Sequence, residues 1–212
     1  LPLPCLERLD AVVLGPGLGS GNPQAAAAAG EGAIWEALQR LSGLLLLDAD
    51  GLNRLAAGAD AIPWLQGRQG PTWLTPHRGE IERLFPDLAP LPALTAAEQA
   101  ARRSGCSVLL KGARTVVAAP DGRRWQLGFA NPQAARAGLG DVLAGYGGGR
   151  GAMALAAGAE ADAALLAAAA LEHAAAADQA VQRRGPGQAT PSEVAAALQS
   201  PYSNTSTTPE KL

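Results

Sequence analysis

Short apolar runs alternate with longer mixed stretches along most of the chain, and each run ends at glycine, proline or a charged residue. The apolar runs predict buried strands, because they are too short for helices and are bounded by turn signals. They cover residues 11–14, 44–47, 72–75 and 107–112. Strands that alternate with helices are typical of an α/β fold with a mostly parallel sheet and helices on both faces.

Capping signals mark where the helices between these strands begin. Asn22-Pro23 offers an N-cap followed by proline, and predicts a helix that runs to about residue 41. Two capping boxes, Thr95 to Glu98 and Thr190 to Glu193, predict helices that run to about residues 104 and 199. A further short helix is expected near residues 81–85.

The second half of the chain adds a hairpin, a glycine run and a long alanine-rich stretch. Residues 115–119 and 124–127 flank the turn Pro120-Asp121-Gly122 and predict an antiparallel hairpin. The glycines within residues 147–151 predict a break, followed by a long helix over residues 156–183. Residues 200–212 are polar and predict a disordered tail, so we expect one domain over residues 1–199.

Composition narrows the class of protein. The 212 residues are 48% hydrophobic but only 4% aromatic, with a formal net charge of −2. That charge argues against a nucleic-acid-binding face, and the apolar run at 163–171 is too short to span a membrane. The two cysteines form no close-spaced motif, which favours a reduced, cytoplasmic setting. The chain opens on Leu1 and enters a strand almost at once, so we expect a piece of a longer chain.

The strongest chemical signal is the run that contains Gly138, Gly140 and Asp141. A helix that begins here would present unbonded amide N–H groups, which form a site for anions. A carboxylate at such a place would repel phosphate unless it had a task, such as accepting a proton from an attacking hydroxyl. The alternative, equally weighted on spacing alone, is a tight loop with Asp141 as a helix cap.

Other polar residues follow the predicted strands. Residues 15–21 form a glycine-rich turn that matches neither the dinucleotide fingerprint nor the P-loop, so ligand contact and a plain turn remain equal readings. Asp48 and Asp50 end the second strand, whose carboxyl end is where ligands gather in an open α/β sheet. His77 follows the third strand, where ligands gather in open sheets, although a lone histidine is more often structural.

Five stretches, in this order, resemble the ADP-dependent NAD(P)H-hydrate dehydratases of the ribokinase-like superfamily. They are residues 13–19 (VLGPGLG), 47–53 (LDADGLN), 74–80 (LTPHRGE), 110–115 (LKGART) and 138–145 (GLGDVLAG). The resemblance covers about residues 9–199. It implies a three-layer αβα fold with a mostly parallel central sheet and an antiparallel hairpin, lacking the family's N-terminal strands.

The resemblance also implies a reaction and its residues. A phosphoryl group would pass from ADP, or from ATP, to the ring hydroxyl of hydrated NADH or NADPH, and loss of phosphate would restore the cofactor. Asp141 would accept the hydroxyl proton, and the amides of 138–141 would hold the moving phosphoryl group. The implied nucleotide-binding residues are Lys111, Gly112, Ala113, Arg114, Thr115, Gly138 and Gly140. The implied hydrate-binding residues are Gly17, His77, Asn131 and Asp141.

The same resemblance implies Mg²⁺, with no ligand set visible, a homo-oligomer, and an epimerase domain on the same full-length chain. The sequence departs from the family pattern at Leu139, where a small hydroxyl residue is usual, and at Gln133-Ala134, where Gly-Met is usual. An upstream glycine-rich segment that completes the hydrate pocket in the family is also expected to precede this chain. Two alternatives stay open: an ATP-dependent kinase of a vitamin precursor or sugar, and a non-catalytic nucleotide-binding relative.

Overall fold

The computed structural model describes residues 8–19, 31–58, 60–128 and 132–198. Within these residues six strands form one sheet in the order β1-β2-β3-β4-β5-β6. The strands are β1 (Ala11–Leu14), β2 (Leu44–Leu47), β3 (Thr72–Leu74), β4 (Ser107–Leu110), β5 (Val116–Ala118) and β6 (Arg124–Gln126). β1 to β4 pair in parallel, and β4, β5 and β6 pair antiparallel. The predicted parallel sheet with an added hairpin is confirmed.

Alternating side chains of the strands face two separate cores. On one face Leu45, Leu47 and Leu74 pack against helices of the first half of the chain. These helices are α2 (Glu31–Arg40), α3 (Ala49–Ala57), α4 (Ala61–Gln66), α5 (Arg78–Leu84) and α6 (Ala93–Ser104), with the short 3₁₀ turn η2 (Pro86–Leu88). Successive strand residues point to opposite sides of a sheet, so an apolar run such as 44–47 must be covered on both.

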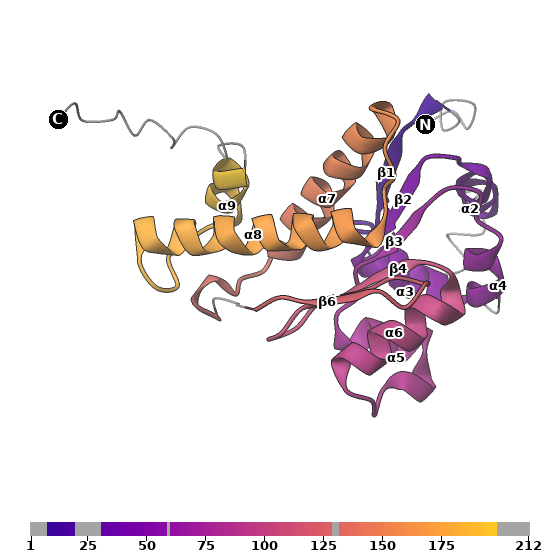
Figure 1. Ribbon diagram of the computed structural model, residues 1–212, viewed down its shortest axis with the longest axis horizontal. Helices are drawn as coiled ribbons and strands as arrows, with labels where there is room; N and C mark the ends of the chain where they lie inside the picture. The colour runs from indigo at the N-terminus through magenta and orange to yellow at the C-terminus, as the bar shows by residue number, and fades with distance from the viewer. Residues whose placement is uncertain (1–7, 20–30, 59, 129–131, 199–212) are drawn as a thin grey trace.

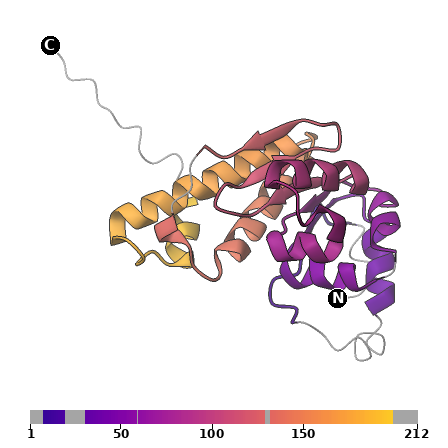
Figure 2. The same ribbon diagram turned by 90° about the horizontal axis from the view of Figure 1, so that it is seen from below.

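On the other face Leu44, Leu46 and Trp73 pack against α7 (Leu139–Ala156) and the first half of α8 (Ala163–Arg184). Figures 1 and 2 show these two helices on the side of the sheet away from α2 and α4. The layers are therefore helix, sheet and helix. This arrangement matches the expected three-layer fold.

The second half of α8 extends beyond the sheet, where it meets α9 (Pro191–Leu198) (Figure 1). A third apolar cluster, built mostly of alanines, joins these two helices to the 3₁₀ turn η3 (Pro132–Ala134). In the part of the chain that the structure describes, no helix is long and apolar enough to cross a bilayer.

The expected helix break at residues 147–151 is wrong, because α7 runs without interruption from Leu139 to Ala156. Two of its glycines allow the helix to pack closely against the sheet. A Cβ on Gly148 would lie 2.3 Å from Val13 Cγ2, and one on Gly151 would lie 2.2 Å from Leu44 Cδ2. The cost of glycine in a helix is about 1 kcal/mol each. Here that cost is offset by a close approach of the helix to the sheet.

Two other boundaries also differ from expectation. The helix expected from residue 156 begins at Ala163, since residues up to Ala156 belong to α7. The first capping box is wrong, because α6 begins at Ala93 and places Thr95 inside the helix. The second is confirmed: the backbone N–H of Thr190 donates to Glu193 Oε2 at 2.9 Å, and the Glu193 N–H donates to Thr190 Oγ1 at 3.3 Å.

Candidate active site at the carboxyl edge of the sheet

The carboxyl ends of β1 to β4 bring four loops to one edge of the sheet. β1 leads into the glycine turn that starts at Gly15, β2 into Asp48, β3 into His77 and β4 into Lys111. The last two are linked by an isolated parallel bridge, in which the Lys111 N–H donates to the Pro76 carbonyl at 2.8 Å. In open α/β sheets this edge is where ligands bind.

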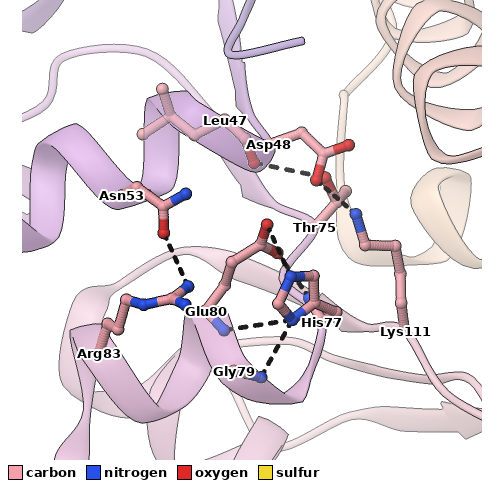
Figure 3. Close-up of polar contacts among 9 residues, drawn as sticks. All are labelled: Leu47, Asp48, Asn53, Thr75, His77, Gly79, Glu80, Arg83 and Lys111. Carbon is pink, nitrogen blue, oxygen red and sulfur yellow. Dashed lines mark hydrogen bonds and ion pairs between the residues drawn. The ribbon is translucent and has the colours of Figure 1, made fainter. Parts of the chain in front are cut away.

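A buried ion pair lies at the centre of this edge (Figure 3). Lys111 Nζ lies 2.5 Å from Asp48 Oδ1, and the two side chains are 23% and 2% exposed. Asp48 stands in extended conformation immediately before α3, so the positive end of that helix also favours its charge. Lys111 was a predicted site residue, whereas Asp48 was noted only at the end of its strand and was not predicted to pair with it. Their positions at the ends of two parallel strands were the available signal.

The first turn of α7 lies directly beside this ion pair. Gly138 precedes the helix in the left-handed conformation, with φ 89°. A Cβ on Gly140 would lie 3.6 Å from Lys111 Nζ and 3.8 Å from Asp48 Oδ2. The first backbone N–H groups of a helix have no intrahelical acceptor, and here the ammonium group of Lys111 lies beside them. The arrangement can hold a negatively charged group at the N-terminus of α7.

Asp141 lies in the first turn of α7, and its side chain is exposed. The structure does not give it a capping hydrogen bond, because the N-cap position belongs to Gly138. A cavity of about 140 Å³ lies next to this turn, and Leu139 and Leu143 of α7 form part of its wall. Asp141 is therefore open to a ligand on the edge of the sheet rather than enclosed.

The same cavity touches the stretch expected to bind nucleotide. Its walls come from Thr115, Leu127 beyond β6, residues 134–135, α7 and the middle of α8. Thr115 is half-buried, whereas Gly112, Ala113 and Arg114 are exposed. Of the expected nucleotide residues, Lys111, Gly138 and Gly140 therefore gather at the ion pair, and Thr115 lines the cavity beside it.

His77 serves as the N-cap of α5. Its Nδ1 accepts hydrogen bonds from the backbone N–H groups of Gly79 at 3.0 Å and Glu80 at 3.3 Å. Glu80, which is 4% exposed, accepts the His77 N–H at 2.7 Å and completes a capping box. The imidazole side chain remains 53% exposed. Its Nε2 also lies 3.2 Å from Glu80 Oε1, so both ring nitrogens contact residues of α5 (Figure 3).

The glycine-rich turn after β1 combines a packed residue with an open one. A Cβ on Gly15, at φ 140°, would lie 1.7 Å from the Asp48 carbonyl oxygen, so this position needs glycine for close backbone contact. Gly17, at φ 76°, has nothing within 4 Å of a Cβ position. The turn is held by Arg54, which donates to the carbonyls of Leu18 at 2.9 Å and Gly19 at 3.2 Å. Gly17 is thus exposed at the edge, and Asn131 lies outside the described residues.

Comparison with known proteins gives the family of the chain. A family model described as NAD(P)H-hydrate dehydratase matches residues 2–200. The chain belongs to the NAD(P)H-hydrate dehydratase family. The resemblance of the five sequence stretches is thereby confirmed, and the ribokinase-like fold with it.

Relatives within this family are longer proteins. The bifunctional NAD(P)H-hydrate repair enzyme Nnr of Synechocystis is 46% identical over 144 residues, which are 68% of this chain and 26% of that protein. Its counterpart in Moorella thermoacetica is 40% identical over 188 residues, 86% of this chain and 33% of that protein. The matched part of the chain thus spans about a quarter to a third of these curated relatives.

Solved structures of the dehydratase fold superpose on most of the chain. The ADP/ATP-dependent NAD(P)H-hydrate dehydratase of Bacillus subtilis, crystallised with ATP and Mg²⁺ and soaked with CoA, gives a TM-score of 0.68 at 25% identity. The match covers 90% of this chain and 64% of that one. A ribokinase-like protein of Enterococcus faecalis gives a TM-score of 0.74 at 23% identity, covering 92% and 63% of the two chains, which shows the shared fold.

Proposed function

We propose that this chain carries the dehydratase activity of an NAD(P)H-hydrate repair enzyme. The hydroxyl oxygen of the hydrated nicotinamide ring would attack the terminal phosphorus of ADP, AMP would leave, and the hydroxyl proton would pass to Asp141. The C–O bond to the new phosphate would then break, and loss of a proton from the neighbouring ring carbon would restore NADH or NADPH. Phosphate is a far better leaving group than hydroxide, so phosphorylation of the hydroxyl lowers the barrier to elimination.

The position of α7 is the observation that carries this proposal. Its first turn, with Gly140 beside Lys111 and Asp48, places amide N–H groups and an ammonium at one point of the sheet edge. These groups suit the negative charge of a phosphoryl group in transfer. Asp141, in the same turn and open to the edge, is placed to accept a proton from a hydroxyl that approaches this point.

Asp48 has a positioning role in this scheme. The buried carboxylate holds Lys111 Nζ at 2.5 Å and so keeps the ammonium at the N-terminus of α7. Since the lysine side chain is 23% exposed, it can contact a phosphate without leaving Asp48. The nucleotide would extend from this point along residues 111–115 toward the adjoining cavity.

Mg²⁺ would accompany the nucleotide. Among the described residues no cluster of three or more His, Cys, Asp or Glu side chains could hold a metal ion. This fits Mg²⁺, which keeps several waters and is commonly held by one or two carboxylates together with substrate phosphates. When bound, the ion would neutralise charge on the phosphates.

The hydrated ring would lie on the other side of Asp141, against Gly17, His77 and Asn131. Nδ1 of His77 accepts two backbone N–H groups and Nε2 lies 3.2 Å from Glu80 Oε1, so the exposed face of the imidazole is what the hydrated ring would contact. An epimerase domain on the same full-length chain, a homo-oligomeric state and a cytoplasmic location are part of this proposal. They rest on the resemblance, and on the bifunctional names of the relatives.

Recovery of the reduced ring provides the test. The full-length protein that carries this chain is incubated with NADH hydrate, Mg²⁺ and either ADP or ATP, and the absorbance of reduced nicotinamide is followed. We expect recovery with ADP, accompanied by AMP and inorganic phosphate. Asp141→Asn should lower the rate about 100-fold or more. Asp121→Asn, at an exposed turn of the hairpin, is the matched control and should keep the rate.

Three outcomes would overturn the proposal. Full activity of Asp141→Asn would remove the assigned base. Phosphorylation of a small alcohol by ATP, without recovery of NADH, would identify a kinase. Absence of AMP binding by calorimetry in the folded chain would remove the nucleotide site itself.

A further inference from the structure

His173, in the middle of α8, has a ring nitrogen without a hydrogen-bond partner in the described part of the molecule. The atom is Nε2, and it is buried. The backbone of Leu139 forms a hydrogen bond with the ring, which raises its pKa, while burial has the larger effect and lowers the pKa below 6.5. Buried polar atoms are almost always paired in folded proteins, so an exception needs an explanation.

The unpaired nitrogen belongs to a ring that lines the cavity beside α7. That cavity measures about 140 Å³, and its other walls are mainly leucine and alanine side chains from α7, α8 and from Leu127, Ala134 and Ala135. Pockets for whole drug-sized ligands measure about 300–1,000 Å³, so this one fits a single ring system. Apolar walls on both sides suit a flat, stacked heterocycle rather than a charged group.

The tautomer of His173 follows from its neighbours. A backbone carbonyl can only accept, so the ring nitrogen that faces Leu139 carries the proton. Nε2 of a neutral imidazole is then an acceptor. Thr115, the other polar side chain in the cavity wall, already donates its hydroxyl to the Gly112 carbonyl at 3.4 Å. Nε2 is therefore the unpaired acceptor of a ring that forms part of this wall, and because the atom is buried, a small turn of the ring would bring it to a donor in the cavity.

We propose that His173 selects adenine as the base of the bound nucleotide, by accepting a hydrogen bond from its 6-amino group at Nε2. Adenine carries a donor at position 6, whereas guanine and hypoxanthine carry an acceptor there. Two acceptors that face each other in an apolar slot leave both unpaired, which is the arrangement most costly to binding. This inference rests on the proposed function, since it names the base of the nucleotide that the same site would bind.

The test compares binding of nucleotides that differ only at position 6. Calorimetry on the chain with AMP, purine riboside 5′-monophosphate and inosine 5′-monophosphate presents, in turn, a donor, a hydrogen atom and an acceptor. We expect AMP to bind about tenfold more tightly than the purine nucleotide and to exceed inosine monophosphate by a larger factor. Equal affinities of the three would overturn the inference and leave the proposed function standing. No binding of any of them would contradict both.

Variants and a spectroscopic signal test whether His173 causes the preference for AMP. His173→Leu removes the acceptor and should reduce the preference for AMP over inosine monophosphate to about twofold or less. A retained preference in this variant, shown to be folded by circular dichroism, would overturn the inference. The chain has 2 histidines, so ¹⁵N spectra of the imidazoles can be assigned with a His77→Asn variant. AMP should shift the Nε2 signal of His173, and no shift on saturation would contradict the contact.

Discussion

The glycines of α7 give a prediction with opposite signs at two neighbouring positions. Gly149 is exposed, and a Cβ there would meet nothing within 4 Å. At Gly151 the same Cβ would lie 2.2 Å from Leu44 Cδ2 and 3.5 Å from Trp73 Cη2, and both side chains are fully buried. Replacing each glycine by alanine in turn separates helix propensity from packing.

The magnitudes follow from these surroundings. Alanine gains about 1 kcal/mol over glycine in a helix interior, so Gly149→Ala should raise the free energy of unfolding by about that amount. Gly151→Ala gains the same propensity but overfills the core, which costs about 1–3 kcal/mol. The net effect at Gly151 is then a loss of up to about 2 kcal/mol. The two variants should differ by about 1–3 kcal/mol.

Urea unfolding, followed by circular dichroism, measures this difference. For a chain of this length 1 kcal/mol corresponds to about 2–4 °C, so melting temperatures should rise for Gly149→Ala and fall for Gly151→Ala. Stabilisation by Gly151→Ala as large as that by Gly149→Ala would refute this explanation. In that case the close approach of α7 to β2 and β3 would not be what glycine provides there.

Three further predictions concern single side chains. Lys111→Met leaves the Asp48 carboxylate, 2% exposed, without its ammonium and should cost about 3 kcal/mol in urea unfolding. Asp48→Asn leaves a lysine that can reach water and should cost about 1 kcal/mol, so the reverse order would contradict the buried pair. Because burial lowers the pKa of His173, the unfolded chain takes up its proton first as the pH falls through 6.5, and stability falls below that pH. His173→Gln should show a smaller loss as the pH falls below 6.5, and an unchanged loss in urea titrations would contradict it. Burial raises the pKa of the Cys106 thiol to about 12, so in a Cys5→Ser background a thiol reagent should modify it only as the chain unfolds. Rapid modification of the native protein would show that this thiol is accessible.

The sheet was predictable because its signals are local. The run 44–47 is apolar throughout and must be covered on both faces, which identified a central parallel strand without further information. The hairpin likewise followed from its turn Pro120-Asp121-Gly122. His77 and Lys111, at the carboxyl ends of β3 and β4, were identified for the same reason, since the strand ends determine which loops share an edge, whereas the pairing of Lys111 with Asp48 was not.

The remaining features depend on contacts between distant residues. Residues 147–151 look like a helix break because propensity counts only the cost of glycine, whereas its gain comes from Val13 and Leu44, more than a hundred positions away. The Asp48–Lys111 pair joins residues 63 positions apart. Nothing in the sequence around His173 indicated a binding role, because the residue stands in an alanine-rich stretch that predicts only a buried helix.

The glycines of α7 that face the sheet also set the distance between the helix and the sheet, and therefore the position of the first turn of α7. Gly151 lies about 15 Å along the helix axis from Asp141, and both belong to the same uninterrupted helix. A bulkier residue at Gly151 would push that part of α7 away from the sheet and tilt its first turn away from Lys111. A residue that never meets a ligand can in this way be under selection for the sake of catalysis.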